Sequence, residues 1–324
     1  MSTPMLAGLA GNAPLKDSIA RMQAAGRMSH SLLLVGEAGL GAGFAARSLA
    51  ADLLYPQGGA AASALLRGEC CRALPDPLPD GSVETGVVRE AIEVRPCGAA
   101  NQIKVSQIRA MRSEIFNSSL SAAGRAVLLY HAETMNESAA NALLKVLEEP
   151  PEDVTFLLTA SSLAALLPTI RSRCISFALA PVSPEECAAY CKKHGAKEEA
   201  IPRWSRIFDG RIGTVLALAS DKRRRQRLET AEALMAAAAK KDAYAADMLL
   251  APFANNKDKA GAFEVLDDIC ALCAASLREA SLCPLAPAAA VRAVKAADAA
   301  RDELQANVSL KLALTVLAMR LAKA

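Results

Sequence analysis

One arginine of this sequence lies where its side chain can act on a bound anion. Arg173 stands between Ser172 and Cys174, in a short segment that leads into the β-prone run Ile175 to Phe177. Its guanidinium is permanently charged, and its planar set of N–H donors matches phosphate oxygens. Packing explains the apolar residues on either side but does not require an arginine here. We therefore predict that Arg173 delivers positive charge to an anion on a neighbouring molecule.

A glycine loop forms the second candidate site. Gly36, Gly39 and Gly41 lie between a predicted strand (SLLLV) and a predicted helix, the order that a phosphate-binding loop requires. In such loops a lysine reaches the β- and γ-phosphates and a Ser or Thr hydroxyl holds magnesium. Here those positions are Ala42 and Gly43. Backbone N–H groups could still cradle an anion, but we expect a retained fold without ATP turnover.

The strand AVLLYHAETM lacks the second part of an ATPase site. Magnesium-dependent ATPases need a carboxylate where a neighbouring strand ends. The corresponding residues here are Tyr130 and His131, and Glu133 is displaced by two positions. We interpret His131 as structural or solvent-facing rather than as a catalytic base. Two separate losses at one site favour a chain that does not hydrolyse ATP.

The residues around Arg173 predict the elements that position it. An apolar stripe with helical spacing follows the N-cap candidate Asn136, and Pro150-Pro151 prevents the helix from continuing. Val154 to Thr159 has the β-branched, apolar character of a buried parallel strand. Leu163 to Leu167 is expected to form a short helix that Pro168 ends. The stripe consists of Ala140, Leu143, Leu144 and Leu147.

The stretch NALLKVLEEPP, together with the later Ser172-Arg173-Cys174, resembles the clamp-loader branch of the AAA+ ATPases. The resemblance extends over most of residues 1–220 and is greatest to the delta-prime family of bacterial DNA polymerase III subunits. In this branch the SRC motif carries an arginine finger that reaches the ATP site of the next subunit. The resemblance thus implies that Arg173 acts in trans, with Ser172 and Cys174 completing its motif.

The resemblance also implies a fold and a domain organisation. It predicts an α/β domain of AAA+ (P-loop NTPase-like) type over residues 1–178, with a degenerate ATP site. A small helical lid domain over 179–222 and an all-helical collar, or oligomerisation, domain over 223–324 are expected to follow. Pro181 and Pro184 mark the first junction, and Ser183 is expected to cap a helix that stops at Gly195.

The function implied by the resemblance is that of a delta-prime-like stator in the DNA polymerase III clamp loader. Such a subunit supports the loading of the sliding clamp onto primed DNA in replication, without catalysis or a cofactor of its own. Its implied partners are tau/gamma-type ATPase subunits and a delta subunit, with the clamp and DNA reached through the complex. Two alternatives stay open: an active clamp-loader ATPase subunit, and a DNA-binding adaptor without a role in ATP turnover.

The cysteines do not favour a metal site. Related subunits commonly insert a four-cysteine zinc module at residues 56–100, but this chain has Cys70, Cys71 and the distant Cys97 there. Adjacent cysteines can hardly both ligate one tetrahedral zinc, and three thiols leave its shell incomplete. We predict a metal-free remnant. Prolines and glycine over 75–81 predict a turn-rich loop inside it.

Two basic segments are candidates for contact with DNA. Lys104, Arg109 and Arg112 form one flank of a predicted helix over 101–117. Arg223, Arg224 and Arg225 belong to the run DKRRRQR, which we interpret as an exposed helix start. Phosphate contacts need only positive charge, but a solvated helix face has the same pattern. Both interpretations stay open for the first segment.

Composition is that of a helix-rich, soluble chain. Of 324 residues 52% are hydrophobic but only 4% are aromatic, and the net charge of +3 is too small to indicate nucleic-acid binding by itself. We find no apolar run of about 20 residues that would cross a membrane, and no signal-peptide pattern at the N-terminus. Nine scattered cysteines suit buried thiols in a reducing compartment. We therefore expect a cytoplasmic protein.

Overall fold

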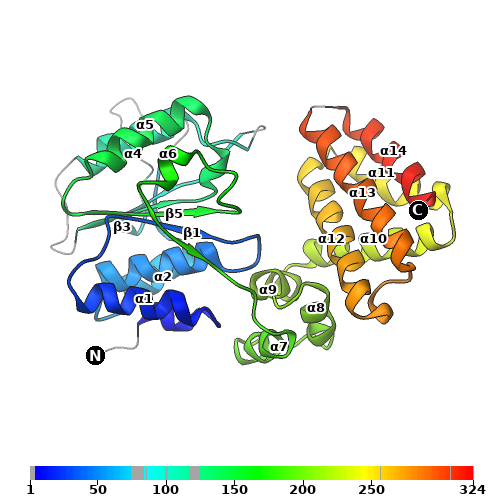
Figure 1. Cartoon of the computed structure of the whole chain (residues 1–324), viewed down its shortest axis with the longest axis horizontal. Helices are drawn as coiled ribbons and strands as arrows, with labels where there is room; N and C mark the ends of the chain where they lie inside the picture. Colours follow the sequence, from blue (N-terminus) through cyan, green and yellow to red (C-terminus); the bar gives the residue numbers. More distant parts are fainter. Residues whose placement is uncertain are drawn as a thin grey trace. The chain divides into compact units, whose positions relative to one another are not determined.

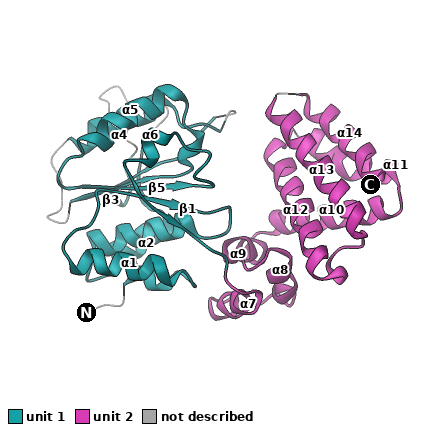
Figure 2. Ribbon diagram, in the orientation of Figure 1, with its two compact units in different colours: residues 1–181 teal, residues 182–324 magenta. Residues whose placement is uncertain are grey.

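The structure, a computed structural model, describes residues 4–73, 84, 86–98, 101–116, 124–255, 257–306 and 308–323. The chain divides into two compact units, Met1–Pro181 and Val182–Ala324 (Figure 2). Unit 1 is built around a parallel β-sheet and unit 2 is helical (Figure 1). A parallel α/β sheet followed by a helical region confirms the fold class expected from the sequence.

The sheet of unit 1 has six strands in the order β2-β3-β4-β5-β1-β6, all paired in parallel. β1 lies between β5 and β6, with Ser31 opposite Phe156 and Leu32 opposite Ile175. The glycine loop after β1 and the segment before β6 are therefore built on neighbouring strands. The strands are β1 (Ser31–Val35), β2 (Cys70–Arg72), β3 (Val88–Val94), β4 (Arg125–Leu129), β5 (Val154–Ala160) and β6 (Ile175–Ala178).

Helices cover both faces of the sheet (Figure 1). Alternate residues of a strand point to opposite faces, so neighbouring leucines of β1 enter different cores. Leu33 packs with residues of α4, α5 and α6, whereas Leu32 and Leu34 pack with residues of α1, α2 and α3. The helices are η1 (Met5–Gly8), α1 (Ala13–Ala24), α2 (Ala42–Leu54), α3 (Ala60–Arg67), α4 (Val105–Ile115), η2 (Ala132–Thr134), α5 (Glu137–Glu148) and α6 (Pro168–Arg171).

The predicted boundaries of α5 are confirmed, and one predicted helix is wrong. Asn136 caps α5 by accepting a hydrogen bond from the Ala139 N–H at 2.8 Å. The short helix expected over Leu163 to Leu167 is not formed; α6 instead begins at Pro168. Proline favours the first turn of a helix because its missing N–H would have no partner there. Pro168 therefore starts a helix rather than ending one.

Unit 2 consists of helices around a single hydrophobic core. Ser183 caps its first helix by accepting from the Glu186 N–H at 3.1 Å, as predicted. The core includes Cys187, Cys191 and Cys273, which therefore serve packing, and it also includes Trp204. The helices are α7 (Pro184–Lys193), α8 (Ile201–Ile207), α9 (Ile212–Ser220), α10 (Lys222–Ala239), α11 (Ala243–Asn255), α12 (Lys259–Arg278), η3 (Ala280–Leu282), α13 (Pro287–Gln305) and α14 (Leu310–Ala322).

The division of unit 2 into a lid (179–222) and a collar (223–324) stays a prediction. One core runs from Cys187 in α7 to Leu321 in α14, so packing is continuous across the expected boundary. None of the helices in the described part of the chain combines the length and apolar character that crossing a bilayer requires.

Candidate functional site

Arg173 lies in the turn that connects α6 to β6. Backbone hydrogen bonds close this turn: the Arg173 N–H donates to the Ile170 carbonyl at 3.1 Å and the Cys174 N–H donates to the Arg171 carbonyl at 3.4 Å. Ile170 is 1% exposed and anchors α6 in the core beneath α5. The backbone of Arg173 is thus fixed to the end of α6, which the core holds in place, while its side chain lies at the surface.

The guanidinium of Arg173 is held by its own chain. Its Nη1 donates to the Thr169 carbonyl at 3.0 Å and to the Ser172 hydroxyl at 3.5 Å. Its Nη2 forms an ion pair with Glu148, the last residue of α5. The Arg173 side chain is 33% exposed and that of Glu148 is 49% exposed. A permanent charge is therefore presented to solvent in a defined position.

The two other residues of the SRC motif support this position and offer no separate chemistry. The Ser172 hydroxyl donates to the Thr169 carbonyl at 3.0 Å and so closes α6. Cys174 packs against the core that contains α5. Burial raises the pKa of Cys174 to about 11, so its sulfur is a neutral thiol near pH 7.

The glycine loop has the backbone conformation that its glycines allow. Gly39 and Gly41 have φ angles of 87° and 93°, in the left-handed region that favours glycine. Gly41 is the N-cap of α2, and Ala42 is its first residue. The Gly36 N–H donates to the Ala160 carbonyl at 2.9 Å, which ties the loop to β5.

Tyr130 fills the space beside Gly43. A Cβ atom at position 43 would lie 3.3 Å from the Tyr130 ring and 3.8 Å from the Arg47 guanidinium. Tyr130 is 6% exposed, and the guanidinium carbon of Arg95 lies 4.5 Å from its ring centroid. Burial raises the pKa of Tyr130, so the phenol is neutral. The Tyr130 ring thus lies in close contact with the place where a side chain at position 43 would begin.

Arg95 is held in place by a buried carboxylate. Glu93 on β3 is 1% exposed and accepts from Arg95 at 2.9 Å and from Arg72 at 3.3 Å. The Cys70 thiol also donates to Glu93, at 3.5 Å, and burial raises the pKa of Cys70 to about 12. Sequence reasoning did not single out Arg47, Arg95 or Glu93, because isolated charged residues carry no motif.

His131 and Glu133 are directed to the end of β5. His131 has a φ of 54°, and its N–H donates to the Thr159 hydroxyl at 3.0 Å. Its ring is 60% exposed and lies 3.4 Å from Glu133, a carboxylate that raises the pKa of His131. The same carboxylate accepts from the Ser161 N–H at 3.2 Å. These contacts fix the turn after β4.

Cys70 and Cys71 lie on opposite faces of the sheet. Cys70 packs in the core under α2, whereas Cys71 packs in the core under α4. The Cys97 thiol is directed to the Gln107 side chain at 3.5 Å. The described residues contain no group of three or more His, Cys, Asp or Glu that could hold a metal ion. Absence of zinc stays a prediction, and the expected turn over 75–81 lies outside the described residues.

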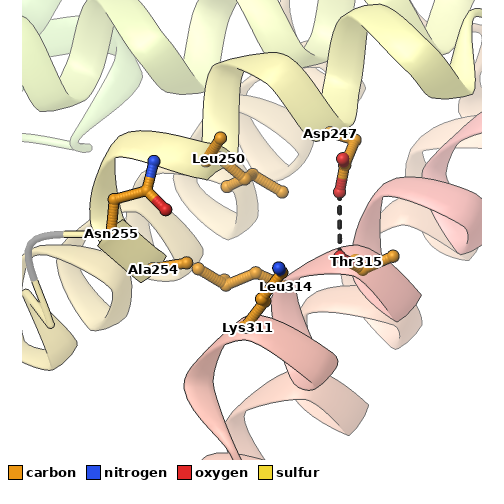
Figure 3. A pocket seen from close by; sticks show the side chains of 8 residues that line it. Asp247, Leu250, Ala254, Asn255, Lys311, Leu314 and Thr315 are labelled. Carbon is orange, nitrogen blue, oxygen red and sulfur yellow. Dashed lines mark hydrogen bonds between the residues drawn. The ribbon is translucent and has the colours of Figure 1, made fainter.

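A small pocket between α11 and α14 has no chemistry of its own (Figure 3). Its volume is about 40 Å³, room for a few water molecules. Asp247 accepts a hydrogen bond from Thr315 at 2.9 Å at its edge (Figure 3). We assign this pocket no substrate.

Comparison with known proteins places the chain in a family. The family described as "DNA polymerase III, delta subunit" matches residues 11–183 of the 324. The chain belongs to this family.

Curated relatives of this family member agree with that placement. The chain is 37% identical over 149 residues to "DNA polymerase III subunit delta'" of Pseudomonas aeruginosa. The aligned region is 45% of this chain and 42% of that protein. It is 33% identical over 159 residues to the protein of that name from Bacillus subtilis, covering 49% and 44%. It is 30% identical over 167 residues to "DNA polymerase III subunit gamma" of a Buchnera aphidicola strain, covering 52% and 43%. The matches span less than half of each relative.

A solved structure covers more of the chain. The solved structure is a gamma subunit-related protein of DNA polymerase III from Thermotoga maritima. The superposition covers 94% of this chain and 97% of the Thermotoga chain, at 20% identity and a TM-score of 0.49.

The two basic segments of this delta-subunit family member differ in their ion pairs. Lys104, the N-cap of α4, and Arg109 and Arg112 within this helix are exposed, and they make no ion pair with any described residue. In α10 the interpretation as an exposed helix start is only partly right. Arg224 pairs with the fully buried Asp268, and Arg225 pairs with Glu198 at 2.7 Å.

Of the three arginines 223–225, only Arg223 is exposed, and its N–H donates to the N-cap Asp221. The Arg224 pair therefore joins α10 to α12, and the Arg225 pair joins α10 to the segment between α7 and α8. The sequence shows the charge run but not the carboxylates that face it.

Proposed function

We propose that this chain is a non-hydrolysing, delta-prime-like subunit of a DNA polymerase III clamp loader. In this proposal Arg173 contacts ATP bound by an adjacent tau/gamma-type ATPase subunit. A delta subunit completes the assembly, which acts in the cytoplasm on the sliding clamp and primed DNA. Family membership supports the assembly, and the residues around Arg173 and Gly43 support the division of labour.

One observation carries the proposal. Arg173 is held at the surface on the motif Ser172-Arg173-Cys174, while the glycine loop of the same chain has Ala42 and Gly43 where a lysine and a hydroxyl are needed. Tyr130 packs against Gly43, so restoring a side chain there would require the ring to move. Arg173 is suited to bind phosphate, but its own chain lacks the side chains that hydrolysis requires. Action on another subunit is the best explanation for such an arginine.

The proposed role is electrostatic. In the neighbouring subunit water attacks the γ-phosphorus, the bond to the β–γ bridging oxygen breaks, and ADP and phosphate form. Negative charge develops on the oxygens during this transfer, and a guanidinium neutralises it. Ser172 and Thr169 hold Nη1, so they orient the group without contacting phosphate.

The test is Arg173→Ala in a complex reconstituted with ATPase subunits, with Arg171→Ala as the matched control. Arg171 is an exposed arginine two residues away, so it reports the effect of losing a charge. An arginine finger is worth about 10³–10⁵ in rate at the site it serves. The loss in total hydrolysis should be smaller, because only one ATP site faces this chain.

Arg173→Lys should rescue little, since an ammonium lacks the planar fork. Folding and assembly should stay near wild type in all three variants. Hydrolysis and clamp loading that are unchanged in Arg173→Ala at matched assembly would reject the proposal.

Exposed basic residues on α4 favour one further candidate function, direct contact with DNA. Lys104, Arg109 and Arg112 supply charge for phosphate contacts. Tight, salt-sensitive DNA binding by the isolated chain would favour a DNA-binding adaptor. Weak binding alone and strong binding in the complex would favour the clamp-loader subunit.

A further inference from the structure

The guanidinium proposed to act on phosphate already has an anionic partner. Glu148 binds Nη2 of Arg173, while Nη1 is held by the Thr169 carbonyl and the Ser172 hydroxyl. Nε of Arg173 donates to no described residue, and the side chain as a whole is 33% exposed. The arginine is thus held by two kinds of contact, neutral oxygens on one side and a carboxylate on the other.

Glu148 lies at an electrostatically unfavourable place for a carboxylate. It is the last residue of α5, and Glu149 is the C-cap. The C-terminal end of a helix carries partial negative charge, which disfavours carboxylates there. Arg173 lowers this cost by pairing with Glu148. Local helix stability therefore gives no reason for Glu148, and the ion pair with Arg173 does.

We propose that Glu148 is a resting partner that competes with phosphate for Arg173. In the isolated chain the carboxylate occupies a donor that a phosphate oxygen would use, and the ion pair must open before the finger engages. A carboxylate left beside a triphosphate would repel it, so both anions cannot bind the guanidinium equally well. Ser172 and Thr169 keep Nη1 in place, so the change is confined to one ion pair. This inference rests on the proposed function, since it concerns the regulation of the same arginine.

The effect is expected to be small and measurable. Pairs between partly exposed charges shift an equilibrium by about 1.4- to 5-fold. When a binding group is available for only a fraction of the time, its apparent affinity is its intrinsic affinity multiplied by that fraction. Neutralising Glu148 should therefore raise engagement of the finger by about 1.4- to 5-fold.

Two measurements test this, with Glu148→Gln compared with Glu149→Gln. The control removes a neighbouring carboxylate at the same helix end, and Glu149 forms no ion pair with any described residue. The first measurement is the rate at which phenylglyoxal modifies Arg173 in the isolated full chain, followed by mass spectrometry. Glu148→Gln should accelerate modification about 1.4- to 5-fold, and Glu149→Gln should leave it unchanged.

The second measurement is ATP hydrolysis by the reconstituted complex, with and without clamp and primed DNA. Glu148→Gln should raise the unstimulated rate by a similar factor and change the stimulated rate less, because the finger is already engaged there. Equal effects of the two glutamine variants, a lower rate in Glu148→Gln, or faster modification without faster hydrolysis would each overturn the inference.

Arg173→Ala separates the two levels of the argument. If it leaves hydrolysis unchanged, the proposed function fails, whatever Glu148→Gln does to modification. If it lowers hydrolysis while Glu148→Gln matches Glu149→Gln, the proposed function stands and only the competition by Glu148 is rejected.

Discussion

Arg224→Met should destabilise unit 2 strongly, because it leaves a buried carboxylate without its partner. Arg224 donates two hydrogen bonds to Asp268, at 2.5 and 2.6 Å, and Asp268 is 0% exposed. Removing one member of a buried pair costs about 3–5 kcal/mol. Methionine retains most of the apolar stem of arginine, so the loss reports the charge rather than the packing.

The cost should depend on pH. Burial raises the pKa of Asp268 from its ordinary value of 3.8 to about 6, and Arg224 opposes that rise. The pKa is therefore higher in the folded state, so the stabilisation from protonation is fully present below pH 4 and is lost as pH rises through about 6. Without Arg224 the pKa of Asp268 in the folded protein rises further, so the loss of stability continues to higher pH. The deficit of Arg224→Met should grow above pH 6 by up to about 1.4 kcal/mol per pH unit.

The assay is urea unfolding followed by tryptophan fluorescence at pH 5, 7 and 8. Trp204 is the single tryptophan and is 5% exposed in the core of unit 2, so the signal reports this unit. Arg301→Met is the control: its partners Asp267 and Asp298 are 65% and 54% exposed, so the cost should be below about 1 kcal/mol.

Replacing both buried partners, with Arg224→Met and Asp268→Leu, should recover most of the stability, since no charge is then left unpaired. The reasoning is refuted if Arg224→Met costs no more than Arg301→Met, or if its deficit is the same at pH 5 and pH 8.

Two predictions concern unit 1. The purified chain should show no ATPase activity. The double variant Ala42→Lys, Gly43→Thr should not gain nucleotide binding, because Tyr130 occupies the adjacent space. ATP turnover by the purified chain that disappears on Gly41→Ala would contradict the first of these expectations. The purified chain should contain no stoichiometric zinc, because Cys70 and Cys71 point to opposite faces of the sheet; elemental analysis that finds about one zinc per chain, lost on Cys70→Ser, would overturn it.

Much of the fold follows from local patterns. The strand SLLLV, the N-cap Asn136 and the N-cap Ser183 were each predicted from residue types that act over a few positions, and each is confirmed. Pro168 shows the limit of such signals. Proline is common both just after one helix and in the first turn of the next, so its position alone does not predict which of the two forms. In the structure α6 begins at Pro168, and Ile170 of this helix is buried in the core.

Contacts between distant residues could not be predicted in this way. Tyr130 and Gly43 are 87 positions apart, and the sequence gives no sign that the ring of one packs against the other. The sequence gives no sign of the pairing of Arg224 with Asp268 either, so the basic run predicts an exposed surface that the structure only partly has. Spacing along a helix predicts which residues share a face, but it does not say what that face meets.

The positions of the two candidate sites explain how one can change while the other is kept. Ala42, Gly43 and Tyr130 surround the start of α2, whereas Arg173 is fixed by Ile170, Thr169 and Ser172 beside the edge strand β6. No described contact of Arg173 involves the glycine loop. The residue types at positions 42 and 43 therefore have no direct bearing on the contacts that hold Arg173. Under the proposed function, action on a neighbouring subunit requires the turn after α6 and does not require a working ATP site in the same chain.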